Sequence, residues 1–413
     1  MSDAGDPTAA AATLLVTVTG RDRPGVTSAL FEVLSELDVA VVDVEQVVIR
    51  GRLVLGVLVT APDTSERTVA EALEAVLTPL GMEVELSTSG DPDHHDDPRR
   101  RGRSHVTVLG HPLRPAAMAG VAGCIAGCGA NIDRIVRIAH YPVTAVELEV
   151  SGAPASELRA RLALAAAALG VDVAVERSGL HRRAKRLVVL DVDSTLVQGE
   201  VIEMLAEHAG YAAEVAAVTE SAMRGELDFA DALRARVAML EGLDAGVLDD
   251  VRRSVLLAPG ARTFVRTLKR LDYRLAVVSG GFTQVTDMLV DQLGLDFAAA
   301  NTLEIADGRL TGRLVGPVLD RAGKAAALER FAREAGVPLS QTVAIGDGAN
   351  DLDMLAAAGL GIAFNAKPVV REAADTSLNV PYLDAILFLL GISRQEIETA
   401  DAEEGLAVVT PPT

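Results

Sequence analysis

Residues 187–195 read Leu-Val-Val-Leu-Asp-Val-Asp-Ser-Thr, a short apolar run that ends in two carboxylates. Four consecutive large apolar residues are typical of a strand that is buried on both faces of a parallel sheet. Asp191 and Asp193 follow at once, and two carboxylates beside a buried strand are costly unless a cation compensates them. The segment therefore predicts a divalent cation at the carboxyl end of a strand.

Two further apolar runs end in polar residues in the same way. Residues 275–278 lead into Ser279-Gly280-Gly281, and residues 343–345 lead into Gly346-Asp347-Gly348-Ala349-Asn350-Asp351. Between these runs, Lys324 opens a predicted helix over 324–335. Alternating strands and helices predict a doubly wound parallel α/β sheet, in which ligands bind beyond the carboxyl ends of the strands. Polar motifs at several such ends predict one shared site.

The composition limits the possible partners and the cellular location. The 413 residues suffice for two or three domains, and the formal net charge of -20 argues against nucleic acid and anionic membranes. No signal peptide and no apolar run long enough to cross a bilayer is recognised. The two cysteines, Cys124 and Cys128, are interpreted as small buried residues. Without a disulfide framework, a cytoplasmic protein is expected.

Two polar segments, 88–104 and 178–186, divide the chain into blocks over 13–88, 104–177 and 186–395. His94 and His95 lie in the first segment among aspartates, where a solvated linker is favoured over a metal site. The first two blocks repeat the order strand, helix, strand, strand, helix, strand. This order predicts two ferredoxin-like βαββαβ domains ahead of the α/β domain.

The loop after the first strand, Gly20-Arg21-Asp22-Arg23-Pro24-Gly25, resembles the opening of ACT domains, which are regulatory modules that bind amino acids. The second block has Gly110-His111-Pro112-Leu113-Arg114-Pro115 instead, without the Asp and the second Gly. The resemblance implies a regulatory site near Asp22, Gly25 and Gly110, and a homodimer formed by paired ACT sheets. The alternative is a tight turn that needs Gly and Pro for backbone reasons alone.

The third block resembles the haloacid dehalogenase-like superfamily, through the four motifs at Asp191–Thr195, Ser279, Lys324 and Gly346–Asp351. Its variant looks like the phosphoserine phosphatase branch. The resemblance implies that Asp191 is the nucleophile that forms an aspartyl-phosphate and that Asp193 is the general acid and base. It also implies a Mg²⁺ bound by Asp191, the backbone carbonyl of Asp193, and Asp347.

Further roles follow from the same resemblance. Ser279, Gly280 and Lys324 hold the phosphoryl group, and Asn350 and Asp351 support the metal shell and Lys324. Residues of about 198–250 resemble a small helical cap that closes over the substrate. There Glu200 takes the ammonium of phosphoserine, Arg236 takes its carboxylate, and Met223 and Phe229 supply apolar contacts. An ordinary charged helix face is the alternative for Glu200 and Arg236.

The favoured function is a phosphoserine phosphatase that performs the last step of serine biosynthesis, with serine as a feedback inhibitor. A related phosphatase or phosphotransferase acting on another small phosphorylated metabolite is the alternative enzyme. A non-catalytic amino-acid sensor is a third interpretation, and the intact Asp193, Lys324 and Asp347 argue against it.

Overall fold

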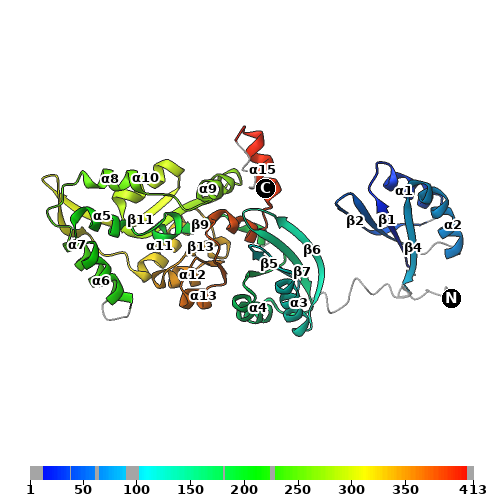
Figure 1. Ribbon diagram of the computed structural model, residues 1–413, viewed down its shortest axis with the longest axis horizontal. Helices are drawn as coiled ribbons and strands as arrows, with labels where there is room; N and C mark the ends of the chain where they lie inside the picture. Colours follow the sequence, from blue (N-terminus) through cyan, green and yellow to red (C-terminus); the bar gives the residue numbers. More distant parts are fainter. Residues whose placement is uncertain are drawn as a thin grey trace, which may run out of the picture. The chain divides into compact units, whose positions relative to one another are not determined.

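The computed structural model describes residues 13–37, 39–60, 65–89, 102–179, 182–223 and 228–406 (Figure 1). They belong to two compact units, Met1–Pro98 and Arg99–Thr413. Within the described ranges, no helix is long and apolar enough to cross a membrane.

The first unit is a four-stranded antiparallel sheet with two helices. Its elements are β1 (Thr13–Arg21), α1 (Val26–Ser35), β2 (Val41–Ile49), β3 (Arg52–Thr60), α2 (Glu66–Leu77) and β4 (Met82–Ser89), in the strand order β2-β3-β1-β4. Alternate residues of β1, Leu14, Val16 and Val18, are buried against the helices. The edge strand β2 is exposed along its whole length, including all of its valines.

The second domain repeats this topology. Its elements are β5 (Ser104–Gly110), α3 (Pro115–Gly127), β6 (Asn131–Ala139), β7 (Thr144–Ser151), α4 (Ala155–Leu169) and β8 (Asp172–Arg177), in the order β6-β7-β5-β8. The predicted pair of βαββαβ domains is confirmed. This domain contributes Leu109, Ala145 and Ala174 to the same hydrophobic core as the α/β domain, which the sequence predicts to be the catalytic domain.

The catalytic domain is built on a seven-stranded sheet in the order β12-β11-β10-β9-β13-β14-β15. The strands are β9 (Leu187–Leu190), β10 (Arg274–Phe282), β11 (Phe297–Ala306), β12 (Arg309–Val315), β13 (Thr342–Gly346), β14 (Gly361–Phe364) and β15 (Thr376–Leu378). All pairs are parallel except β11–β12. The four residues of β9 are fully buried at the centre, as the decisive apolar run predicted.

Helices accompany the strands in sequence. They are α9 (Ala261–Arg270), α10 (Thr283–Leu293), α11 (Arg321–Glu334), α12 (Leu352–Ala357), α13 (Pro368–Ala373), α14 (Ile386–Leu389) and α15 (Arg394–Glu403). Two separate apolar clusters contain opposite faces of β9, one with Val188 and Leu190 and the other with Leu187 and Val189. The doubly wound α/β fold is therefore confirmed.

A helical cap is inserted between β9 and α9. It consists of α5 (Val201–Ala209), α6 (Ala212–Met223), α7 (Phe229–Ala238) and α8 (Val247–Ser254). The two chain segments that connect it to the sheet run antiparallel, because Val197 forms a bridge with Leu257 and Ala258 N donates to Leu196 O at 2.9 Å. A short two-stranded hinge, formed by residues 196–197 and 257–258, thus connects the cap to the sheet.

The second domain is fastened to the catalytic domain along the edges of both sheets. Strand β8 lies beside β15, where Asn379 N donates to the Asp172 carboxylate at 2.8 Å and Thr376 Oγ1 donates to Val173 O at 3.2 Å. Arg159 of α4 pairs with Asp375 at 3.0 Å. These contacts cover an edge of the catalytic sheet that would otherwise be open.

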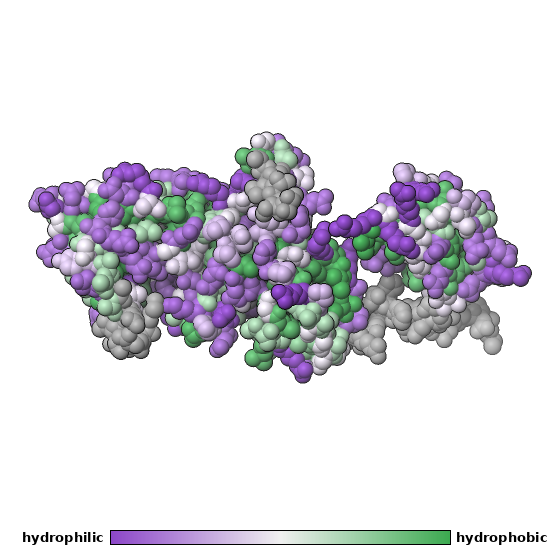
Figure 2. Space-filling view, in the orientation of Figure 1, coloured by the Kyte–Doolittle hydropathy of each residue, from purple (hydrophilic) through white to green (hydrophobic). Residues whose placement is uncertain are grey.

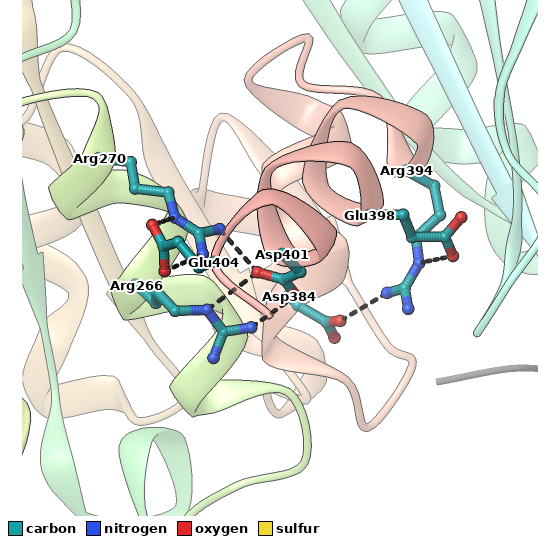
Figure 3. A network of polar contacts seen from close by, with 7 residues as sticks. All are labelled: Arg266, Arg270, Asp384, Arg394, Glu398, Asp401 and Glu404. Atoms are coloured by element: carbon teal, nitrogen blue, oxygen red, sulfur yellow. Dashed lines mark hydrogen bonds and ion pairs between the residues drawn. The ribbon is translucent and has the colours of Figure 1, made fainter. Parts of the chain in front are cut away.

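The C-terminal helix α15 extends beyond the predicted domain end at 395. Its Asp401 binds Arg266 and Arg270 of α9 at 2.7 and 2.6 Å (Figure 3). At the other end of α15, Arg394 pairs with Asp384 at 3.4 Å, and its guanidinium lies 5.6 Å from the ring centroid of Tyr141 in the second domain. Helix α15 therefore contacts both domains.

Candidate active site

The predicted nucleophile lies at the end of β9 beside a buried cation. Asp191 is 4% exposed and Lys324 is fully buried. The Lys324 Nζ donates to Asp191 Oδ1 and to Asp351 Oδ1, both at 2.7 Å. Lys324 is 133 positions from Asp191 and 27 positions from Asp351 in the sequence, and the three side chains meet beyond the carboxyl end of β9. The lysine is placed between two carboxylates, of which Asp351 orients it and Asp191 is next to the open cavity.

A sharp turn after β9 sets the position of Asp193. Ser194 has a φ of +58°, and its N–H donates to Gly199 O at 3.0 Å. The two carboxylate oxygens of Asp193 then accept from Val201 N at 2.8 Å and from Ser279 Oγ at 3.0 Å. The Asp193 side chain, which follows β9, therefore faces Ser279 of the neighbouring strand β10.

The segment Ser279-Gly280-Gly281 lies near the carboxyl end of β10 and has little space for larger residues. A Cβ at Gly280 would lie 3.1 Å from Phe229 Cζ, and a Cβ at Gly281 would lie 2.8 Å from the Asp193 carboxylate. Phe229 comes from α7, so the cap approaches the segment directly at Gly280. The two glycines therefore allow Phe229 and Asp193 to approach this segment closely.

Asn301 is a site residue that the motif order does not reveal. It is 3% exposed, its Nδ2 donates to Gly280 O at 2.8 Å, and its Oδ1 accepts from Leu319 N at 2.7 Å. Asn301 thus joins the carboxyl end of β10 to the segment that leads into α11 and Lys324. Its contacts are to backbone atoms of distant segments, so no local pattern marks it.

Three carboxylates could hold a cation. Asp191, Asp347 and Asp351 each offer an oxygen, and these oxygens lie within 4.8 Å of one another. Asp347 also accepts from Thr195 Oγ1 at 3.0 Å, and Asp351 accepts from Gly348 N at 3.0 Å as well as from Lys324. One lysine among three carboxylates leaves excess negative charge, and hard oxygen donors of this kind suit Mg²⁺. The donor set therefore fits the predicted ion.

The pKa values reflect this crowding of charge. Burial and the neighbouring Asp351 raise the pKa of Asp191 well above its ordinary value, and the same two causes raise the pKa of Asp347 to about 6. Burial also raises the pKa of Asp193, against the hydrogen bonds from Val201 and Ser279. Burial alone would lower the pKa of Lys324, but Asp191 and Asp351 outweigh it and raise that pKa. Added positive charge would relieve the strain among the carboxylates.

A cavity of about 640 Å³ lies between the catalytic edge and the cap. Its lining contains the predicted residues Asp191, Asp193, Glu200, Phe229, Arg236, Gly280, Asp347 and Asn350, together with Thr219, Arg321 and Lys367, which were not predicted. Ser279 and Lys324 lie just behind this lining and contact Asp193 and Asp191. Met223 ends helix α6, and its side chain lies outside the described residues.

Two opposite charges stand in the cap side of this cavity. Burial and the charge of Asp193 raise the pKa of Glu200 to about 7. Arg236 is 8% exposed, and burial lowers its pKa, partly offset by Glu200. An arginine remains charged after such a shift because its ordinary pKa is so high. The cavity can therefore present one acidic and one cationic group to a small zwitterionic ligand.

The predicted regulatory residues lie in the small domains. Gly25 has a φ of +94° at the start of α1, and Asp22 N donates to Gly51 O at 2.8 Å. Gly110 ends β5, where a Cβ would lie 3.1 Å from Leu113 Cα. These backbone features also satisfy the alternative of a tight turn, so the regulatory role stays a prediction.

Comparisons with known proteins agree with this geometry. The haloacid dehalogenase-like hydrolase family matches residues 188–356, and two ACT domain families match residues 12–87 and 103–176. A phosphoserine phosphatase of Streptomyces coelicolor is 63% identical over 390 residues, which cover 94% of each chain. One of Mycobacterium tuberculosis is 56% identical and covers 94% of this chain and 95% of its own.

A solved structure shares the fold beyond the catalytic domain. The crystal structure of a probable phosphoserine phosphatase from Vibrio cholerae superimposes with a TM-score of 0.56 at 36% identity. The match covers 75% of this chain and 90% of the other. Sequence and fold comparisons thus agree over a larger part of the chain than the haloacid dehalogenase-like match at residues 188–356.

Proposed function

The chain belongs to the phosphoserine phosphatases with a haloacid dehalogenase-like fold, and we propose that it hydrolyses O-phospho-L-serine to L-serine and phosphate. The observation that supports this most directly is the shared cavity of Asp191, Glu200 and Arg236. A nucleophile for phosphorus and partners for both ends of an amino acid lie within it. The reaction is the last step of serine biosynthesis.

The first half-reaction uses Asp191 and Asp193. A carboxylate oxygen of Asp191 attacks phosphorus, the bond from phosphorus to the serine oxygen breaks, and Asp193 gives its proton to that oxygen. Burial raises the pKa of Asp193 above its ordinary value, which is the direction that a proton donor needs. Lys324 and Ser279 stabilise the phosphoryl oxygens, since one is a buried cation and the other a hydroxyl near the carboxyl end of β10.

The second half-reaction releases phosphate. Asp193, now deprotonated, accepts a proton from water as the water attacks the phosphorus of the aspartyl-phosphate. The bond between Asp191 and phosphorus breaks, so both carboxylates return to their starting state. Closure of the cap would support this order, because Phe229 of α7 approaches Gly280 and would limit the entry of water until serine has formed.

We propose that Asp191, Asp347 and the backbone carbonyl of Asp193 hold Mg²⁺, with Asn350 and Asp351 supporting that shell. When bound, the ion neutralises repulsion between the nucleophile and the anionic phosphate. Glu200 takes the substrate ammonium and Arg236 its carboxylate, while Phe229 and Met223 close over the carbon chain. Removal of the metal with EDTA should abolish phosphate release, and added Mg²⁺ should restore it.

The nucleophile is tested with Asp191→Asn. Purified wild-type protein with Mg²⁺ is expected to release phosphate from L-phosphoserine, and the variant should lose at least about 10³-fold in kcat, because an amide cannot form the acyl-phosphate. Thermal unfolding of both proteins checks that the variant is folded. A folded Asp191→Asn protein with wild-type activity would contradict the mechanism. Release of phosphate from other phosphomonoesters only would favour the alternative of another small phosphorylated metabolite.

Feedback by serine is proposed to act through the first ACT domain near Asp22 and Gly25. Gly25 needs a φ of +94°, which an alanine adopts only with strain. Gly25→Ala should therefore raise the serine concentration for half-inhibition several-fold without changing kcat. Inhibition that stays the same would place serine sensing elsewhere, in the second ACT domain near Gly110 or in the active site.

A homodimer is proposed because the first ACT domain leaves apolar surface open. On strand β2, Val41, Val44, Val47 and Ile49 are all more than 40% exposed, and Figure 2 shows apolar surface on the small domains. Pairing of such strands or faces would cover it. A monomer in sedimentation velocity at micromolar concentration would contradict this.

The unpaired Cys124 and Cys128 support a cytoplasmic location, which cell fractionation can test.

A further inference from the structure

Helix α6 provides a hydrogen-bond partner for the cap arginine. Arg236 Nη1 donates to Thr219 Oγ1 at 3.2 Å, and Thr219 Oγ1 donates to Val215 O at 2.9 Å. A hydroxyl has one proton and two lone pairs. Because the Thr219 hydroxyl donates its proton to the Val215 carbonyl oxygen, it accepts from Arg236 through a lone pair. The hydroxyl is therefore oriented as an acceptor for the guanidinium.

The remaining contacts of Arg236 leave one edge of its guanidinium available. Its Nε donates to Ala232 O of the same helix at 3.3 Å. In the described part of the chain, Arg236 Nη2 makes no hydrogen bond to protein, while Arg236 and Thr219 both line the cavity. A guanidinium is a planar fork, so two fixed donors determine the direction of the others. Thr219 and Ala232 together determine where the free edge points.

We infer that Thr219 is a positioning residue for substrate selection, which holds Arg236 so that its free edge binds the carboxylate of the substrate. The inference rests on the proposed function, in which Arg236 binds that carboxylate. Thr219 acts through Arg236 and not on the phosphoryl group. Its loss should weaken binding of substrates with a carboxylate, and it should leave those without one nearly unaffected.

A simple structural role is the competing explanation. A threonine within a helix often bonds back to the carbonyl four residues earlier, as Thr219 does to Val215, and this has no need of a ligand. A structural role predicts equal losses for all substrates. The two explanations therefore differ in substrate selectivity and not in stability.

The experiment compares wild type, Thr219→Val and Thr219→Ser on two substrates. L-phosphoserine carries the carboxylate, and O-phosphoethanolamine has the same ammonium and phosphate without it. Thr219→Val keeps the side-chain shape but removes the acceptor. We expect kcat/KM for L-phosphoserine to fall about tenfold, mostly through KM, which corresponds to ~1.4 kcal/mol. For O-phosphoethanolamine it should fall less than about twofold.

Two controls separate the outcomes. Thr219→Ser keeps the hydroxyl and should restore the wild-type selectivity, while Ser254→Ala removes a different cap hydroxyl, bonded to Val251 O at 2.9 Å, and should not change it. Thermal unfolding of each variant checks the fold. Equal losses on both substrates, or an unchanged ratio in Thr219→Val, would overturn the inference.

Binding measurements cover the case in which O-phosphoethanolamine is turned over too slowly. Calorimetric titration of Asp191→Asn and of Asp191→Asn with Thr219→Val measures affinity without turnover. The second variant should bind L-phosphoserine about tenfold more weakly and O-phosphoethanolamine equally well. Failure of the proposed function looks different, since wild-type protein would then release no phosphate from L-phosphoserine at all.

Discussion

At the scale of single residues, pH should affect stability through a polar cluster of the second domain, formed by His105, Glu147, Glu176 and Arg182. Glu147 lies 3.3 Å from His105 Nδ1 and pairs with Arg182, which also binds Glu176 at 2.9 Å. Burial alone would raise the pKa of Glu147, but the nearby His105 and the hydrogen-bonded Arg182 outweigh it and lower that pKa to about 2. The ionised carboxylate is thus preferred by the folded state.

The sign of the pH effect follows from this lowered pKa. Glu147 contributes stability above its ordinary pKa near 4.5, and the contribution is lost as pH falls from there towards about 2. Glu147→Gln should lower the free energy of unfolding at pH 7 by about 1–2 kcal/mol, after allowance for solvent screening. Urea titrations between pH 7 and 3 should show the two proteins converging.

A matched control lies two positions along the same strand. Glu149 is 41% exposed and its ion pair with Arg134 spans 3.6 Å, so Glu149→Gln should change stability by less than about 0.5 kcal/mol. A difference between wild type and Glu147→Gln that stays constant with pH would contradict the assignment. In that case the loss would come from packing and not from the charge.

The same scale shows which site residues a sequence can reveal. Asp191, Asp193 and Asp347 follow apolar runs, so the strand-end pattern predicts them and the structure brings them together. Asn301 and Thr219 hold other parts of the site through single hydrogen bonds to distant segments. Such contacts depend on the folded path of the chain and leave no periodic signal. Residues that position the site are consequently the ones missed.

At the scale of elements, the cap is held by more than its hinge. The turn of the β11–β12 hairpin pairs with the cap segment between α7 and α8: Gly242 N donates to Leu310 O at 2.9 Å, Leu310 N donates to Leu243 O at 2.9 Å, and Ala245 N donates to Gly308 O at 2.8 Å. Helix α7 also packs on β12. Since α7 carries Arg236 and Phe229, the hairpin supports the helix that supplies two of the predicted substrate-binding residues.

Gly312 of β12 is required for this contact. It has a φ of +73°, and an added Cβ would lie 3.0 Å from Glu241 Cβ and 3.2 Å from Ala238 O. Gly312→Ala should therefore lower the free energy of unfolding by about 2 kcal/mol or more and raise KM for L-phosphoserine several-fold. Urea unfolding and steady-state kinetics measure both effects.

Gly308 provides the comparison. Its φ of +76° imposes the same backbone cost, but nothing lies within 4 Å of an added Cβ. Gly308→Ala should thus cost only about 1 kcal/mol and leave KM unchanged. Equal effects of the two substitutions would mean that backbone strain alone, and not the contact with α7, accounts for the loss.

No element is predicted for residues 297–315 from the strand-end pattern. Asp307-Gly308 between two segments with alternating apolar residues is a hairpin signal, yet it does not indicate what the hairpin contacts. The three strands β9, β10 and β13 are easier to predict because they are buried and lead into polar motifs. The hairpin is partly exposed and gains its role only from the cap.

At the scale of the whole molecule, the sequence predicts three blocks, whereas the folded chain forms two compact units. The segments 88–104 and 178–186 are both polar, and the sequence predicts a linker at the first and a break between blocks at the second. Only the first coincides with the division between compact units. At the second, Arg182 is held by Glu147 and Glu176, and Lys185 Nζ donates to Ser340 O at 3.0 Å. Composition does not distinguish a linker from a segment held in place by partners far along the chain.

The contact between β8 and β15 has a consequence for how such genes can be rearranged. A recombination breakpoint near residue 98 exchanges one complete folded unit and leaves the other whole. A breakpoint near residue 180 would uncover β15 and the core residues that pack with Leu109, Ala145 and Ala174. The two small domains share one topology, but only the first can be exchanged as a compact unit, since the second belongs to the same unit as the catalytic domain.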